Sequence, residues 1–328
     1  PPSENEGLRF GAILGELAKA GRDKLTLVTS PRLAAFGAWI EQLVAESTGK
    51  HGLGIVPVDG EALDAPDAYG DDRLFVFLAL DAEEDDERAK KRAGLARAGH
   101  PVISIRLESP MDLGQEMFRW EMATAVAGYV LELNPFDQPN VQESKDFTKQ
   151  LLEELGKTGQ LPEPELASVA ADAGLIVQVD PSQADAVGSG SLADVLGRHL
   201  ERAKVPDYVA INAFLPMTDE VEAALATLRS RIRARSPVAT TVGFGPRFLH
   251  STGQLHKGGP DRGVFLHLFA DDADDRPIPG QGYGFASLFR AQELGDFMAL
   301  AKRGRRIVRI GLGADPVAGL RQLANALG

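Results

Sequence analysis

The segment RLFVFLAL (Arg73–Leu80) places seven apolar side chains in a row after one arginine. A run of this kind predicts a buried strand. KLTLVT (Lys24–Thr29) and VISIRL (Val102–Leu107) predict two further strands. We expect a helix at 31–47 and a strongly charged helix at 83–98, whose charges indicate a solvated face. Strands that alternate with helices in this way predict an α/β fold with a largely parallel sheet.

A long apolar helix is expected next, at 113–133. Asp112 is predicted to cap its start, and Pro135 helps to stop it. The helix leads the chain into a polar segment that begins at Asn134.

The sequence changes character after Leu161, where prolines and the Gly-Ser run at 188–191 predict a looser connector with short helices. A second α/β lobe is expected beyond it. We therefore predict three parts, which are residues 1–158, 159–205 and 206–328. The second lobe is expected to contain strands at Tyr208–Phe214, 238–242, 264–269 and 307–310, and helices at 219–235 and near 287–302.

The composition narrows the class of function. With 328 residues and 44% hydrophobic content, the chain has enough apolar residues for a large core, and its length predicts about two domains. A net charge of -12 argues against nucleic acid as a partner, because phosphate backbones require clustered Lys and Arg. An anionic substrate would need a local basic pocket. The chain has no cysteine, which excludes disulfides and cysteine nucleophiles and fits a reducing, cytoplasmic location.

Targeting and membrane signals are not visible. No cationic stretch followed by an apolar run marks a signal peptide. The helix at 113–133 carries too many charges for a membrane span, so we expect no membrane partner. The sequence starts at Pro1 without an initiator methionine, and we interpret it as a fragment of a longer protein.

The segment NPFDQPNVQESK, residues 134–145, follows the long helix and ends in a cation. It resembles the C-terminal signature of phosphoglucose isomerases, which runs Phe-Asp-Gln, two residues, Val-Glu, two residues, Lys. Gln142 stands where that family has Glu, with Glu143 one position later. The positions that fit the signature are Phe136, Asp137, Gln138, Val141 and Lys145.

A second match lies at the end of the predicted helix 31–47. Considered alone, AESTGK is a frayed helix end followed by a polar turn. In phosphoglucose isomerases, however, a helix that ends Gln, three residues, Glu-Ser, one residue, Gly-Lys supplies the base that moves a proton between sugar carbons. The matching positions are Gln42, Glu46, Ser47, Gly49 and Lys50. The resemblance therefore implies that Glu46 is the catalytic base and that Gln42 contacts substrate.

The third match is GFGPRFLHSTGQLHKGGP, residues 243–260. Its glycines and prolines predict a binding loop without regular structure. A histidine in such a loop is commonly a surface residue, yet the segment resembles the isomerase stretch whose histidine works in opening the sugar ring. His250 is therefore a catalytic candidate, and Gln254 a substrate contact. His256 and His267 have weaker claims, and His267 is expected to be structural.

Lys145 stands near the start of a predicted helix at 142–155 and could be an ordinary exposed lysine. The helix macrodipole does not favour a cation there, so another reason for its position is expected. The resemblance implies that Lys145 assists ring opening beside the substrate, that Gln138 contacts substrate, and that Asp137 orients the loop.

Together these matches imply an aldose-ketose isomerisation of glucose 6-phosphate to fructose 6-phosphate through a cis-enediolate. A carboxylate base can move the proton, so the resemblance implies no cofactor and no metal. The implied architecture is a three-layer α/β sandwich of the sugar-isomerase (SIS) type with a second α/β lobe. The family is typically a homodimer in which the histidine reaches the neighbouring subunit's site.

Two departures from the family define what is missing. The N-terminal, phosphate-binding half of a phosphoglucose isomerase has no counterpart here, so the chain is expected to be incomplete alone. The order of the segments is also changed, with Glu46, Lys145 and His250 following one another. The isomerase part of bacterial bifunctional transaldolase/phosphoglucose isomerases resembles this arrangement, and a transaldolase domain would then lie outside this chain.

Two other classes of function remain to be compared. One is a non-catalytic sugar-phosphate-binding or structural module with the same fold, which would not need a base, a lysine and a histidine together. The other is a nucleotide-binding α/β domain. The latter is disfavoured because the sequence contains neither G-x-G-x-x-G after a strand nor G-x-x-x-x-G-K-[ST].

Overall fold

The computed structural model describes residues 4–172, 174–271 and 274–328. It forms two compact units, each built from several stretches of the chain. The first unit contains Pro1–Pro139, Pro237–Thr241 and His250–Asp261. The second contains Asn140–Ser236, Val242–Leu249 and Arg262–Gly328. The predicted α/β class is confirmed in both units, but the units do not coincide with the predicted boundaries at 158 and 205.

The sheet of the first unit has four parallel strands. Its order is β2-β1-β3-β4, formed by Val56–Val58, Lys24–Thr29, Arg73–Leu80 and Val102–Leu107. The run at 73–80 is the strand β3, and all eight of its residues are buried. A strand that is paired on both sides and covered on both faces needs an almost unbroken apolar sequence, which explains this run.

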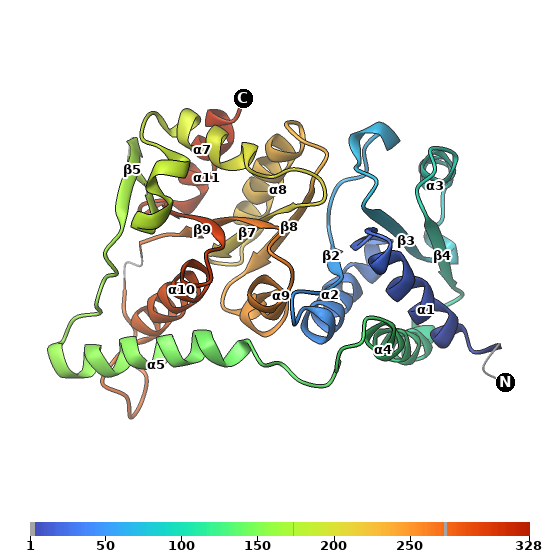
Figure 1. Ribbon diagram of the computed structural model, residues 1–328, viewed down its shortest axis with the longest axis horizontal. Helices are drawn as coiled ribbons and strands as arrows, with labels where there is room; N and C mark the ends of the chain where they lie inside the picture. The colour runs from blue at the N-terminus through green and yellow to red at the C-terminus, as the bar shows by residue number, and fades with distance from the viewer. Residues whose placement is uncertain (1–3, 173, 272–273) are drawn as a thin grey trace. The chain divides into compact units, whose positions relative to one another are not determined.

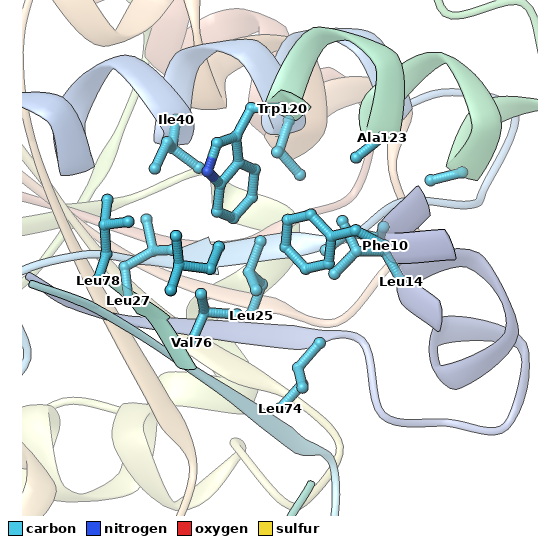
Figure 2. Packing of buried hydrophobic residues seen from close by; sticks show 14 of the residues in the cluster. Phe10, Leu14, Leu25, Leu27, Ile40, Leu74, Val76, Leu78, Trp120 and Ala123 are labelled. Atoms are coloured by element: carbon cyan, nitrogen blue, oxygen red, sulfur yellow. The ribbon is translucent and has the colours of Figure 1, made fainter. Parts of the chain in front are cut away.

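Helices cover both faces of this sheet, which gives three layers (Figure 1). The helices α1 (Glu6–Lys19), α2 (Ala34–Thr48) and α4 (Leu113–Val130) share one core with the apolar side chains of β1 and β3. Figure 2 shows Trp120 of α4 above the sheet, beside Ile40 of α2 and Phe10 of α1. On the other face, Leu95 of α3 (Asp86–Arg97) packs with Phe75, Phe77 and Tyr69.

A buried ion pair brings a distant segment into the first unit. The Arg73 side chain is fully buried, with Nη1 2.9 Å from both Glu61 Oε2 and Thr26 Oγ1. Glu61 Oε1 accepts hydrogen bonds from the backbone N–H of Thr240 at 3.0 Å and from its hydroxyl at 2.8 Å. The strand-forming residues 239–241 are thereby fixed to the first unit, from 179 residues along the chain.

The second unit contains a mixed six-stranded sheet. Three neighbouring strands, β10, β9 and β7, are parallel to one another, whereas β6 pairs antiparallel with β10 and β5 pairs antiparallel with β6. In order across the sheet the strands are β5 (Ala167–Asp172), β6 (Leu175–Val179), β10 (Arg306–Gly311), β9 (Gly263–Phe269), β7 (Tyr208–Phe214) and β8 (Ala239–Phe244).

Helices again lie on both faces of the second sheet. Figure 1 shows α7 (Leu192–Glu201), α8 (Asp219–Arg233) and α11 (Pro316–Ala326) on one side. The helices α5 (Val141–Thr158) and α10 (Phe285–Lys302) pack together on the other side, around Leu151 and Leu294. The short helix α6 is Ala184–Val187.

His267 is structural, as expected, because its ring belongs to a buried charge cluster of the second unit. Its Nε2 lies 3.3 Å from Glu293 Oε1, and Arg309 makes a two-pronged contact with the same carboxylate at 2.8 and 3.0 Å. Burial alone would raise the pKa of Glu293, but the hydrogen bonds from His267 and Arg309 outweigh it and lower the pKa to about 2. Glu293 is therefore ionised throughout the physiological range.

Three expectations about local structure were wrong. The predicted connector contains two strands, β5 and β6, in addition to short helices. Asp112 stands at the N-cap position of α4, but its side chain makes no capping bond there, because its carboxylate accepts from the Ser109 N–H at 2.9 Å and closes a capping box one turn earlier. The Gly- and Pro-rich segment 243–260 is partly helical, with a 3-10 turn at Arg247–His250 and the helix α9 at Thr252–Gly258.

The core of the first unit is expected to depend on Trp120. This side chain is fully buried and meets Phe10 edge to face with ring centroids 4.7 Å apart. Trp120→Ala should lower the free energy of unfolding of this unit by about 3 kcal/mol, because it leaves a cavity. Urea denaturation can be followed by the fluorescence of Trp39, which lies in the same unit and stacks on Phe36.

The control is Phe118→Ala on the same helix, where the ring is 61% exposed. Phe118→Ala should lower the free energy of unfolding by only about 0.5 kcal/mol, because it removes little buried surface. Equal losses for the two variants would contradict the packing described for α4.

Candidate active site

The first predicted segment lies where α2 ends. Gly49 caps this helix by donating its N–H to Ala45 O at 3.0 Å. The Thr48 hydroxyl donates to Val44 O at 2.7 Å and accepts from Ile55 N–H at 3.0 Å. These bonds close a short turn that leads the chain into β2. Two predicted residues, Glu46 and Gln42, lie on the preceding helix: Glu46 is half-buried in its last turn, and Gln42 is exposed one turn earlier.

Lys50 follows directly after the helix cap, and its side chain is fully buried. The ammonium donates to the backbone carbonyl of Asn134 at 2.9 Å and to Asp137 Oδ1 at 2.9 Å. It also donates to the backbone carbonyl of Asp137. The structure thus joins the segment after α2 to the second predicted segment, which begins 84 residues later.

The second segment is a loop that continues to Pro139. Asn134 Oδ1 accepts from Phe136 N–H at 3.0 Å, which folds the loop on itself. The hydrogen bond from Lys50 holds the pKa of the Asp137 carboxyl below its usual value. Asp137 therefore remains an anion that is bonded to Lys50, and the loop-orienting role expected for it stays a prediction. Gln138 follows it and is exposed.

The third segment forms the helix α9, which packs against α2. Gln254 is fully buried, and its Nε2 donates to Gly49 O at 2.8 Å. Gly52 N–H donates to Gly258 O at 2.9 Å. The approach is so close that a Cβ on Gly49 would lie 2.4 Å from the Leu255 Cα. The substrate contact predicted for Gln254 stays a prediction, and the contact seen here joins two helices.

His250 ends the 3-10 turn that precedes α9, and it is exposed. Among the described residues, its ring makes no hydrogen bond or ion pair. It belongs to the first unit, together with Glu46, Gln42, Gln138 and Gln254. Five of the six site residues that the sequence predicts therefore lie in one compact unit.

Lys145 lies in the second unit, on the outer face of α5, and is exposed. Its ammonium has no partner within the part of the chain that the structure describes. The next residue toward the N-terminus, Ser144, is buried instead, and its hydroxyl donates to Asp296 Oδ1 on α10 at 3.2 Å. The packing of α5 on α10 thus fixes the side of the helix on which Lys145 lies. Lys145 belongs to a different unit from the other five predicted site residues.

Two residues that matter for this site received no role from the sequence. Lys50 and Gly49 were matched positions of the AESTGK segment, yet a lysine and a glycine after a helix end look like ordinary surface residues. Only the fold reveals that Lys50 is buried and that Gly49 is in contact with α9.

Within the described ranges, no three His, Asp or Glu side chains come together in a way that could hold a metal ion. The helices of the described residues also lack the combination of length and apolar character that a membrane crossing requires.

No family model matches the chain. Curated relatives are nevertheless found among glucose-6-phosphate isomerases. The enzyme of Leptospira biflexa is 29% identical over 187 residues, which covers 46% of this chain and 41% of the relative. The enzyme of Rubrobacter xylanophilus is 30% identical over 192 residues, or 44% of each chain. The chain is thus distantly homologous to glucose-6-phosphate isomerases, and it spans less than half the length of the relatives it matches.

Solved structures give weaker similarities. A hypothetical protein from Thermus thermophilus aligns over 99% of this chain and 81% of its own length, with 14% identity and a TM-score of 0.32. The C-terminal domain of glucosamine-fructose-6-phosphate aminotransferase from Francisella tularensis aligns over 99% and 94%, with 8% identity and a TM-score of 0.25.

The contact between α2 and α9 is expected to depend on the missing side chain at Gly49. Gly49→Ala should lower the free energy of unfolding of the first unit by about 1–3 kcal/mol, because the new methyl group meets the α9 backbone. Gly114→Ala on α4 is the matched control, since nothing lies within 4 Å of its added Cβ. The control should leave stability unchanged or raise it by up to about 1 kcal/mol. Urea denaturation followed by tryptophan fluorescence measures both variants, and similar effects would contradict the described contact.

Proposed function

We propose that this chain is the portion of a glucose-6-phosphate isomerase that carries the proton-transfer base. The observation that carries the proposal is that two segments, each matching a different active-site motif, both contact the third motif at the C-terminal end of α2. Lys50 bonds the loop at 134–138, and Gly49 bonds Gln254 of α9. Distant homology to glucose-6-phosphate isomerases supports the same conclusion.

The proposed reaction interconverts glucose 6-phosphate and fructose 6-phosphate. It requires one base that takes the proton from C2 and returns it to C1, through a cis-enediolate. We assign this base to Glu46, a carboxylate in the last turn of α2. A single carboxylate can serve in both steps, because taking up a proton in the first step converts it into the acid that donates a proton in the second.

The ring of the sugar must open before the proton moves. This step needs a proton donor at the ring oxygen and an acceptor at the anomeric hydroxyl. We assign it to His250 and Lys145, which are both exposed and which have no side-chain partner among the described residues. Gln42 and Gln138 are exposed in the same way and are assigned to substrate hydroxyls, and Gln254 is assigned to substrate with its amide nitrogen on Gly49.

Groups that bind the phosphate and stabilise the negative charge of the enediolate are proposed to lie outside this chain. Because the chain spans less than half the length of its relatives, we propose that a complementary isomerase portion supplies them. We further propose that the whole protein is a cytoplasmic homodimer, and that a transaldolase domain accompanies it as in bifunctional transaldolase/phosphoglucose isomerases. By itself, the chain is expected to turn over little glucose 6-phosphate.

The test is the exchange of the C2 hydrogen of glucose 6-phosphate with deuterated water, in the protein that contains this chain and its complementary portion. Glu46→Gln should slow the exchange at least about 100-fold, because it removes the base. Sugar-phosphate binding, measured by calorimetry, should persist. Glu87→Gln is the control, since Glu87 lies on the exposed surface of α3 in the same unit.

Two outcomes would contradict the proposal. Near-normal exchange by the Glu46→Gln variant would remove Glu46 as the base. Tight binding of glucose 6-phosphate by the wild-type protein, with neither exchange nor conversion to fructose 6-phosphate, would favour the non-catalytic sugar-phosphate module instead.

A further inference from the structure

The Lys50 ammonium is surrounded by acceptors on the inner side of the loop. An ammonium has three N–H donors, and here three acceptors receive them, the carbonyls of Asn134 and Asp137 and the Asp137 carboxylate. The Lys50 side chain is 0% exposed, whereas that of Asp137 is 49% exposed. The cation thus lies behind the loop, and the anion lies at its surface.

Such a contact needs a reason beyond ordinary packing. A buried ammonium is costly unless it is paired and fully hydrogen-bonded. In the described part of the chain, Asp137 is the one charged group that pairs with it. An apolar side chain would fill the same space without this cost, so the ammonium is retained for what it connects.

The two ends of the contact both carry proposed site residues. Lys50 follows Glu46 by four positions, with the helix cap between them, and Asp137 is the immediate neighbour of Gln138. We infer that Lys50 is a positioning residue, which holds the substrate-contacting loop at 134–138 in register with the base on α2. This inference rests on the proposed isomerase function.

Lys50 is not itself a catalytic residue in this scheme. All three of its N–H groups are engaged and its side chain is inaccessible to solvent, so it does not touch substrate. Its effect is transmitted through the loop, because two of its bonds go to backbone carbonyls. Displacing that backbone by about 1 Å is enough to lower a reaction rate by about 100-fold.

The experiment compares Lys50→Met with Lys91→Met. Methionine has a similar length but neither charge nor N–H donors. Lys91 is a control in the same unit, because it is exposed on α3 and, among the residues that the structure describes, pairs only with Glu87 one turn away, at 3.0 Å. Both variants are made in the protein that contains the chain and its complementary portion. For each variant we would measure the amide exchange of the loop at 134–138, the titration of Asp137 and the steady-state kinetics.

The expected result for Lys50→Met has three parts. Amide hydrogen exchange at 134–138 should become at least about tenfold faster, since the bonds to the two carbonyls are lost. The carboxyl of Asp137, followed by NMR, should titrate at a higher pH than in the wild type. The kcat for isomerisation should fall about 10- to 100-fold with KM changed less than about threefold, since the reacting groups are misplaced. Lys91→Met should change none of these.

Two further variants keep the test decisive. Asp137→Asn keeps the size of the side chain and both carbonyl acceptors and removes only the anion, so it should lower kcat by a smaller factor in the same direction. Lys50→Arg retains the charge and should restore part of the kcat lost in Lys50→Met.

The outcomes separate this inference from the proposed function. If Lys50→Met speeds amide exchange at 134–138 but leaves kcat unchanged, Lys50 is merely structural and the inference is overturned. Unchanged amide exchange at 134–138 would also overturn it. A wild-type protein that neither exchanges the C2 hydrogen nor interconverts glucose 6-phosphate and fructose 6-phosphate would refute the proposed function instead. Loop exchange and the Asp137 titration would then decide whether Lys50 holds the loop, independently of any turnover.

Discussion

The close contact between Gly49 and α9 is the constraint on which the candidate site depends. With no side chain at position 49, the Leu255 backbone comes near enough for Gln254 to bond the carbonyl of Gly49. The two bonded residues are 205 positions apart in the chain. Thr240 bonds the buried Glu61, and the separate segment that begins at His250 also belongs to the unit that contains Glu46. Without the return of this segment, the matched segments would be isolated motifs.

The matched motifs contain two kinds of residue, and the structure separates them. Gln42, Gln138 and His250 are exposed, which suits contact with a ligand. Lys50 and Gly49 are buried and join the segments to one another. A motif therefore combines groups that can meet a substrate with groups that fix their spacing. This division accounts for residues in each motif that have no obvious chemistry of their own.

Much of the fold could be predicted from the sequence, because β3 and β7 are mainly apolar, β1 and β4 alternate apolar with polar residues, and the helices between them are regular. The prediction failed where the local signal is mixed. Glycines and prolines around α9 mask a helix that tertiary packing stabilises, and short strands in a loop-like context hide β5 and β6. The burial of Lys50 could not be predicted, because its partners lie 84 and 87 positions away. The sequence alone also could not show that Gly49 lies against the backbone of Leu255.

The central claim is that the segments at 46–50, 134–138 and 250–254 form one sugar-phosphate site. The most direct test is to record amide chemical shifts of the protein, with its complementary portion, as an open-chain aldonate 6-phosphate is added. This ligand has a carboxylate at C1 in place of the aldehyde and cannot be isomerised. The account predicts saturable shifts in all three segments with one common dissociation constant. Shifts that leave two of the segments untouched, or that fit different dissociation constants, would contradict it.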